Sequence, residues 1–245
     1  MSLNFSFVFL FLVNLFSNYS ENYITNKYSV HGIDVSHHQK YINWQNVSTH
    51  ATFKVSFCFM KATEGSDFKD PRFQTNWKES QKAGITRGAY HFFSASSSPY
   101  AQAQNYIRST RLTPGDLAPV LDFEVSSSTL TPYQVRKNLY RWLSTVEKHY
   151  GVKPIIYTNT NIYNKYLKGY FKEFPLWIAD YSTSNIHSRV SHPNLKLWQY
   201  TEHGRVKGIS GYVDVNAFLG KEDEFQHLTI PIVVEKDTTD IVSTL

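Results

Sequence analysis

The sequence alternates short apolar runs, rich in β-branched and aromatic residues, with longer amphipathic stretches. Eight of the runs have the length and composition of strands: His31–Ser36, Val55–Thr63, Thr86–Phe93, Ala118–Val125, Lys153–Thr158, Phe174–Tyr181, Leu195–Thr201 and Gly211–Phe218. Strands that alternate with helices usually form parallel sheets, because a parallel connection has to cross back over the sheet. The pattern therefore predicts an α/β barrel of mainly parallel strands.

Three of the amphipathic stretches carry helix start and stop signals: Pro71 to Ala83, Pro99 to Arg111 and Pro132 to Tyr150. Each opens with proline, and the first and the last are followed by Gly84 and Gly151, an arrangement typical of helices. The connections after Tyr181 and Thr201 are too short or too glycine-rich for full helices. We therefore expect hairpins to close the second half of the barrel.

The two ends of the chain differ in composition from the barrel domain, which we place at residues 29–220. The first 20 residues carry no charged side chain, and Phe5 to Phe16 is almost wholly apolar. About a dozen apolar residues are too few to span a membrane and suit a secretory signal. We predict a signal peptide over residues 1–20 and a secreted, lysosomal or phagosomal protein without a stable membrane anchor. Residues 221–245 form a C-terminal extension of unknown role, either an edge strand or a segment docked on the barrel.

Composition limits both the partners of the chain and the way it is held together. The formal net charge is +5, but no run of five or more Lys and Arg occurs. An anionic polymer is therefore a better partner than nucleic acid, which we do not expect the chain to bind. Cys58 is the only cysteine, so no intramolecular disulfide can form. Because it lies in an apolar run, we interpret it as a buried strand residue rather than a nucleophile.

Acidic residues fall at the ends of the apolar runs, where solvated acids are not expected. Asp34 ends the first run, Asp122 and Glu124 end the fourth, and Asp214 lies in the eighth. In a parallel barrel the strand ends form one rim, which is where barrel enzymes build their active sites. Asp122 and Glu124 are two residues apart and so share one face of their strand.

Two carboxylates as close as Asp122 and Glu124 cannot ionise independently. Repulsion and burial raise the pKa of one of them, which stays protonated near neutrality and can act as a general acid. Hydrolysis of a glycosidic bond needs such an acid and a second group that stabilises or captures the oxocarbenium-like centre. The pattern favours a sugar-cleaving barrel, and the alternative is a salt-bridged pair that only supports the strand end.

Seven short motifs occur along the chain in this order: Gly32-Ile-Asp34-Val-Ser36, Lys61-Ala-Thr63-Glu64-Gly65, Ala89-Tyr90-His91-Phe92, Asp122-Phe-Glu124, Pro175-Leu-Trp177-Ile-Ala179, Leu197-Trp198-Gln199-Tyr200 and Val213-Asp214-Val-Asn216. Each motif is weak alone, but the ordered set is specific. Through them residues 31–218 resemble glycoside hydrolase family 25, the Chalaropsis-type lysozymes or N-acetylmuramidases. The resemblance implies an irregular TIM-like (β/α) barrel of about five strand–helix units followed by strands in hairpins.

The resemblance also implies a reaction and roles for the acids. It implies an enzyme that cleaves the β-1,4 bond between N-acetylmuramic acid and N-acetylglucosamine of bacterial peptidoglycan without a metal or cofactor, and we expect a monomer. Glu124 matches the family's general acid. Asp122 matches the carboxylate that supports the reacting sugar, either directly or by orienting its 2-acetamido group as an internal nucleophile. Asp34 and Asp214 match the remaining acids, with supporting roles in charge and orientation.

Other polar and aromatic residues near the strand ends are candidates for binding the sugar. The aromatic candidates are Tyr90, Tyr157, Trp177, Tyr181 and Trp198, although core packing explains each of them equally well. Glu64 either contacts substrate or pairs with Lys61. His37 and His38 are adjacent and have no acid or cysteine nearby in the sequence to complete a site, so we predict no metal site.

Two other functions are compatible with parts of the pattern. The Asp-Phe-Glu spacing resembles the end of the chitinase signature, so a related hydrolase of chitin-like N-acetylhexosamine polymers is one alternative. The longer run of acids that precedes that spacing in chitinases is absent here. A non-catalytic cell-wall-binding barrel is the other alternative, but it predicts the loss of a key carboxylate, and none is lost.

Overall fold

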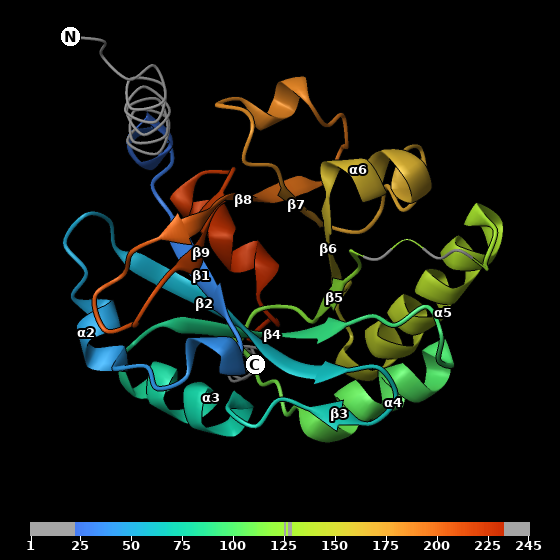
Figure 1. The fold of residues 1–245 in the computed structure, drawn as a ribbon, viewed down its shortest axis with the longest axis horizontal. Helices are drawn as coiled ribbons and strands as arrows, with labels where there is room; N and C mark the ends of the chain where they lie inside the picture. The colour runs from blue at the N-terminus through green and yellow to red at the C-terminus, as the bar shows by residue number, and fades with distance from the viewer. Residues whose placement is uncertain (1–22, 125, 127–128, 233–245) are drawn as a thin grey trace, which may run out of the picture.

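The computed structural model describes residues 23–124, 126 and 129–232. Its centre is a closed barrel of eight strands, which confirms the predicted α/β barrel (Figure 1). In chain order the barrel strands are β1 His31–Val35, β2 Val55–Glu64, β4 Thr86–Phe92, β5 Val120–Asp122, β6 Ile155–Asn159, β7 Leu176–Ala179, β8 Leu195–Gly204 and β9 Val213–Phe218. Each overlaps one of the eight predicted runs.

Seven of the barrel strands are parallel, and β9 runs antiparallel between β8 and β1. The hairpin expected after Thr201 therefore exists and closes the barrel. The segment after Tyr181 differs from our expectation, because β7 and β8 are parallel. Residues 180–194 return along the barrel through the short 3-10 helix η3, Ile186–Ser188, and this length suffices for a parallel crossover without an α-helix. The short strand β3, Phe68–Lys69, forms a separate hairpin with the end of β2.

Helices pack on the outside of the barrel (Figure 1). They are α2 Trp44–Ser48, α3 Phe73–Lys82, α4 Pro99–Ser109, α5 Pro132–Tyr150 and α6 Thr160–Ile162, which continues into the π-helical turn η2, Tyr163–Leu167. The three predicted helices are α3, α4 and α5. Thr131 and Gln134 form a capping box at the start of α5, and Gly151 ends the helix with a left-handed φ of 72°. None of the described helices is long and apolar enough to cross a membrane.

Strand β2 shows how alternation sorts side chains between the two faces of the barrel. Phe57 and Phe59 belong to the inner cluster, whereas Cys58 is fully buried in the outer cluster under the helices, as expected for a strand residue. A Cβ atom on Gly32 would lie 2.4 Å from the Phe57 ring, and one on Gly88 would lie 2.4 Å from the Phe59 ring. The two glycines thus leave the space that the phenylalanine rings occupy inside the barrel.

The described part of the C-terminal extension, residues 221–232, packs against the end of the barrel where the parallel strands begin. It forms the 3-10 helix η4, Glu222–Leu228. The Phe225 ring lies 5.2 Å from that of Phe57 and 5.4 Å from that of Phe218, measured between centroids. Ile230 then donates a backbone hydrogen bond to Asp116 at 2.8 Å. The predicted signal peptide and residues 233–245 lie outside the described residues.

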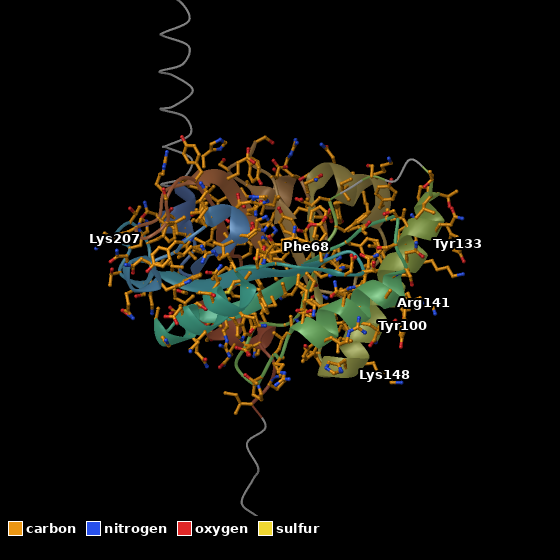
Figure 2. All side chains as sticks on the ribbon, turned by 60° about the horizontal axis from the view of Figure 1, so that its bottom comes forward. Phe68, Tyr100, Tyr133, Arg141, Lys148 and Lys207 are labelled. Carbon is orange, nitrogen blue, oxygen red and sulfur yellow. The ribbon has the colours of Figure 1, made fainter. Side chains whose placement is uncertain are left out.

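Basic side chains are spread over the surface. Figure 2 shows Lys207 at one side of the molecule and Arg141 and Lys148 at the opposite side, on α5. A dispersed charge of this kind fits the absence of basic runs in the sequence.

Candidate active site

The structure brings the four predicted carboxylates together at the end of the barrel where the parallel strands end. Asp34 lies near the end of β1 and pairs across the strands with Asp214, near the start of β9. The antiparallel direction of β9 is what places its first residues at this rim. Asp122 is the last residue of β5, and Glu124 follows two residues later. Asp122 and Glu124 each interact electrostatically with Asp34.

Asp34 is buried and held by two amide groups. Its Oδ2 accepts hydrogen bonds from Asn216 Nδ2 and from Gln199 Nε2, both at 2.8 Å. Burial raises the pKa of Asp34, and the hydrogen bonds from Asn216, Gln199 and Asp214 oppose this rise. Burial and then the charge of Asp34 raise the pKa of Asp214 to about 9. At neutral pH Asp214 therefore holds the proton of this pair, and Asp34 is the ionised member.

Asp122 and Glu124 form the second carboxyl pair. Asp122 is 6% exposed, and its Oδ1 is buried without a hydrogen-bond partner among the described residues. Burial, then the charges of Glu124 and Asp34, raise the pKa of Asp122 well above its usual range. Burial also raises the pKa of Glu124, although its hydrogen bond with Tyr157 opposes the rise. Both shifts favour a protonated carboxyl in this pair, which is the state that general acid catalysis requires.

Three of the predicted tyrosines lie around these acids. The hydroxyls of Tyr157 and Tyr181 both donate to Oε1 of Gln199, at 2.8 Å and 2.6 Å. Tyr157 is buried, whereas Tyr181 is 46% exposed and offers ring surface to solvent. Tyr90 is half-buried, and its pKa is raised well above the usual range by burial and then by the carboxylates of the site, Asp122 first.

The two predicted tryptophans are enclosed by protein. Trp177 is 2% exposed, stacks on Phe59 with 4.7 Å between ring centroids, and donates from Nε1 to Asn216 Oδ1 at 2.8 Å. Trp198 is fully buried in the outer cluster and donates from Nε1 to the carbonyl of Asp180 at 2.8 Å. In this arrangement neither indole offers a free face to a sugar ring.

Glu64 pairs with Lys61, one of the roles considered for it, and its contact with substrate stays a prediction. Lys61 Nζ lies 2.7 Å from Glu64 Oε2, and the Glu64 side chain is 43% exposed. The positive charge of Lys61 lowers the pKa of both Asp122 and Glu124. Glu64 is therefore linked to this carboxyl pair through its contact with the lysine.

The two adjacent histidines are used in local contacts. His37 Nδ1 lies 2.7 Å from Asp70 Oδ2, and the His37 ring packs against that of His38 with 4.1 Å between centroids. Within the part of the chain that the structure describes, no three His, Cys, Asp or Glu side chains are grouped as metal ligands would be.

The sequence analysis gave no role to Gln199 or Asn216, although both contact the predicted acids. Gln199 is 2% exposed and Asn216 is fully buried. The alternation of inward and outward side chains along their strands could have identified them. Gln199 is two residues from Leu197, an inner-cluster residue, and Asn216 is two residues from Phe218, another one. A polar residue on the inner face of a barrel strand is a candidate for the site even when it cannot ionise.

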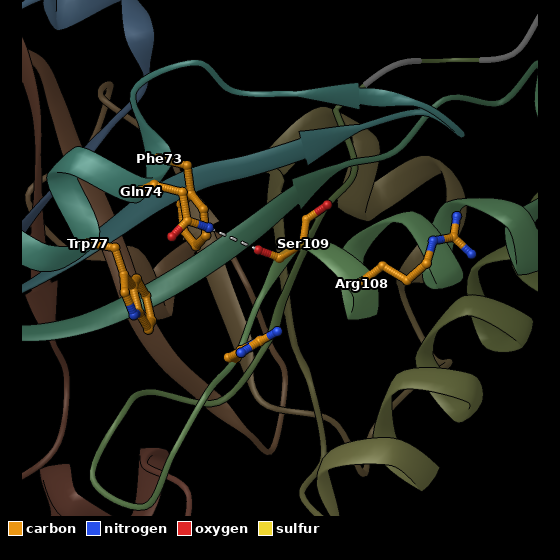
Figure 3. Close-up of a pocket in the computed structure, with 6 residues that line it drawn as sticks. Phe73, Gln74, Trp77, Arg108 and Ser109 are labelled. Carbon is orange, nitrogen blue, oxygen red and sulfur yellow. Dashed lines mark hydrogen bonds between the residues drawn. The ribbon is translucent and has the colours of Figure 1, made fainter.

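The site continues into a cleft of about 440 Å³ next to Glu124, lined also by Asn161, Tyr181 and Arg189. A second hollow, of about 450 Å³, lies between the start of α3 and the end of α4, and none of the four acids lines it. Figure 3 shows this second hollow, in which Gln74 Nε2 donates to the carbonyl of Ser109 at 3.3 Å and the Arg108 side chain points away from Trp77. Glu124, the one of the four acids that lines the first cleft, therefore distinguishes it as the candidate active site.

Comparisons with known proteins identify a family. The chain is 40% identical over 203 residues to the protein YegX of Escherichia coli K12, covering 81% of this chain and 73% of that protein. It is 36% identical over 207 residues to lysozyme M1 of Streptomyces globisporus, covering 78% and 68%. The crystal structure of the bacterial lysozyme from Streptomyces coelicolor superposes with a TM-score of 0.75 at 33% identity, covering 82% of this chain and 97% of that one.

The family comparison covers most of the barrel and three of the four carboxyl groups, and only Asp214 lies beyond it. The model of the glycosyl hydrolases family 25 matches residues 33–209, which include Asp34, Asp122 and Glu124. This agrees with the resemblance carried by the ordered motifs. The chain therefore belongs to the glycosyl hydrolases family 25 and is a glycoside hydrolase.

Proposed function

We propose that this chain is a secreted lysozyme that hydrolyses the β-1,4 bond between N-acetylmuramic acid and N-acetylglucosamine in bacterial peptidoglycan. The observation that carries the proposal is the pair of buried Asp122 and half-buried Glu124 beside the second pair, Asp34 and Asp214. Membership of family 25 and the similarity to lysozyme M1 support peptidoglycan as the substrate class.

Glu124 is the general acid of the proposed reaction. It lines the open cleft, whereas Asp122 lies deeper, so Glu124 is the carboxyl that can reach a glycosidic oxygen. Burial raises its pKa, which favours the protonated form that a general acid needs. Transfer of this proton to the leaving oxygen breaks the bond to C1 of the muramic acid residue. Glu124 then accepts a proton from the water that completes the hydrolysis.

Asp122 assists at the sugar ring. Its unpartnered Oδ1 is an acceptor without a donor, and the N–H of a 2-acetamido group supplies such a donor. Accepting this hydrogen bond orients the acetamido oxygen for attack on C1, and in its ionised form Asp122 stabilises the developing positive charge. Asp34 and Asp214 hold the surrounding network in place. We expect Tyr90, Tyr157, Tyr181 and Glu64 to contact the sugar chain, and Trp177 and Trp198 to support the walls of the site.

The remaining parts of the proposal concern the form of the protein. We expect removal of residues 1–20 on export, action outside the cell or in a lysosomal or phagosomal compartment, and a monomer without cofactor or membrane anchor. Mass spectrometry of the protein recovered from culture medium measures the first residue, and a retained Met1 would contradict the signal peptide.

The central test is Glu124→Gln, assayed on purified peptidoglycan with mass spectrometry of the released fragments. Loss of the acid lowers kcat by about 10³-fold, within the usual range for general acid catalysis. Glu147→Gln is the matched control, because Glu147 pairs with Lys153 on the surface, and it retains wild-type activity. Fragments that end in reducing muramic acid support the bond assignment. Release from chitin oligomers and not from peptidoglycan would overturn the substrate, and full activity of Glu124→Gln would overturn the residue.

A further inference from the structure

The cleft beside Glu124 contains one basic side chain, Arg189, among the described residues that line it. Asp122, Asp34 and Asp214 do not line this cleft. It therefore adjoins the proposed general acid without including the other three carboxyl groups, and it can hold a part of the substrate next to the bond that is cleaved. Its remaining lining residues come from the ends of β6 and β7 and the positions that follow them: Asn159, Thr160 and Asn161, and Ala179 to Ser182.

Asp180 pairs with Arg189 in this cleft and is almost completely buried. Its Oδ1 accepts from the amide and the hydroxyl of Ser182, at 3.0 Å and 2.6 Å, and its Oδ2 accepts from Thr160 Oγ1 at 2.8 Å. Arg189 Nε lies 3.5 Å from the same Oδ2. Burial acts to raise the pKa of Asp180, but these hydrogen bonds together hold it below its usual range. Asp180 is therefore ionised at neutral pH and anchors the arginine instead of donating a proton.

The guanidinium of Arg189 is held at one end and open at the other. Arg189 directly follows the 3-10 helix η3, and its amide donates to the carbonyl of the buried Ile186 at 2.9 Å. The Arg189 side chain is 52% exposed, and among the described residues only its Nε has an acceptor. Its two terminal nitrogens are thus available to a ligand. A planar guanidinium in this state binds a carboxylate through two parallel hydrogen bonds.

Lys61, and not Arg189, is the cation that acts on the carboxyl pair. The positive charge of Lys61 lowers the pKa of both Asp122 and Glu124. Arg189 is instead paired with Asp180, which offsets its charge. Loss of Arg189 should therefore leave proton transfer from Glu124 as it is and affect what the cleft binds.

Carboxylates distinguish the two sugars of peptidoglycan. Muramic acid carries a lactyl ether on C3, next to the acetamido group on C2. The lactyl carboxyl is either free or joined to a short peptide, which carries carboxylates of its own. N-acetylglucosamine and chitin have no such substituent. The group that marks muramic acid thus lies within one sugar ring of the cleaved bond, and Arg189 lines the cleft beside the acid that cleaves it.

We propose that Arg189, anchored by Asp180, binds a carboxylate of the muramic acid substituent in the cleft beside Glu124 and so selects peptidoglycan over uncharged N-acetylhexosamine polymers. The inference rests on the proposed function and adds to it the residue that recognises the substrate. The lactyl group and the attached peptide present the same chemistry to a guanidinium. Because Asp180 already holds Nε, the arginine loses less conformational freedom when the carboxylate binds.

The test compares kcat and KM of the wild type and Arg189→Gln on three soluble glycan strands of equal length. The first has free lactyl carboxylates because its peptides have been removed, the second has the same carboxyls converted to methylamides, and the third retains its peptides. Arg189→Gln should raise KM for the first strand about tenfold, as expected for one charge-assisted pair, with kcat unchanged. On the methylamide strand the two proteins should have the same KM. Arg189→Lys keeps the charge without the planar fork and should recover part of the loss.

Arg141→Gln is the matched control, because it removes one positive charge from α5 on the outside of the barrel, and its KM should equal that of the wild type on all three strands. A loss confined to the strand with peptides would support the carboxylate role and assign it to the peptide. An equal rise of KM on the methylamide strand, or no rise on either charged strand, would overturn the proposal. Failure of the proposed function is recognised separately, because the wild type would then cleave none of the three strands.

Discussion

At the scale of single residues, the site consists of carboxyl groups that folding removes fully or partly from water. Asp34 and Asp214 face each other across two strands, and only one of them is charged at neutral pH because burial and the charge of Asp34 raise the pKa of Asp214 to about 9. Such a pair costs stability whenever the pH is high enough to ionise both groups in the unfolded chain. This loss of stability falls on residues whose charge and orientation we propose to serve the reaction.

Asp214→Asn should remove that cost. The folded-state pKa of Asp214 is raised, so its stabilising effect is complete below its ordinary pKa, near 4, and is lost as pH rises through about 9. Asparagine does not titrate and keeps an N–H that can donate to Asp34. The variant should therefore gain about 2 kcal/mol of unfolding free energy relative to wild type between pH 4 and pH 8. Urea denaturation at both pH values measures the gain, and parallel pH dependences would contradict it.

At the scale of elements, the inner face of β2 places two phenylalanine rings in the barrel interior. Phe57 and Phe59 fill the interior, and they fit because the neighbouring strands β1 and β4 present Gly32 and Gly88 opposite them. The 3-10 helix η4 adds Phe225 to the same cluster from below. The packing of one strand thus depends on two glycines and on a segment distant in the sequence.

Gly88→Ala should destabilise the barrel through β2. The new Cβ would lie 2.4 Å from the Phe59 ring and 3.0 Å from Leu117 Cβ, so the ring has to move off its stack with Trp177. We expect a loss of about 1–3 kcal/mol, as for other overpacked cores. Thermal and urea unfolding of Gly88→Ala, Phe59→Leu and the double variant measure the coupling. In the double variant the smaller side chain should relieve part of the loss, and strictly additive losses would show that the ring is not what the Cβ meets.

At the scale of the whole molecule, the site is acidic while the protein as a whole is basic. Four carboxyl groups line the rim, yet the formal charge is +5 and the basic residues are dispersed (Figure 2). A dispersed positive charge attracts an anionic polymer over a distance without forming a specific contact. Attraction of this kind acts on association and not on the bond-breaking step.

Salt should therefore lower the rate of hydrolysis of intact, anionic cell walls more than that of a short, soluble oligosaccharide. Raising NaCl from about 10 mM to about 300 mM shortens the screening length from about 30 Å to less than 8 Å, and the rate on intact walls should fall several-fold. A short, soluble peptidoglycan oligosaccharide is the control, and its kcat should be unchanged. An equal loss on both substrates would assign the salt effect to the active site itself.

The sequence by itself determined the features that depend on local periodicity. The eight strands and the three predicted helices follow from spacings of two and 3.6 residues, which act within one segment. The ordered motifs added the family. The role of each acid stays a prediction, because no ligand or variant tests it.

The tertiary structure decided what depends on pairing between distant segments. The parallel course of β8, the meeting of Asp34 with Asp214, and the enclosure of Trp177 and Trp198 are set by barrel closure and by register between strands, neither of which is encoded within one strand. Gln199 belongs here as well. Its amide became part of the site only when closure placed it between Asp34 and Tyr157, since a neutral side chain gives no sign of its partners until they surround it.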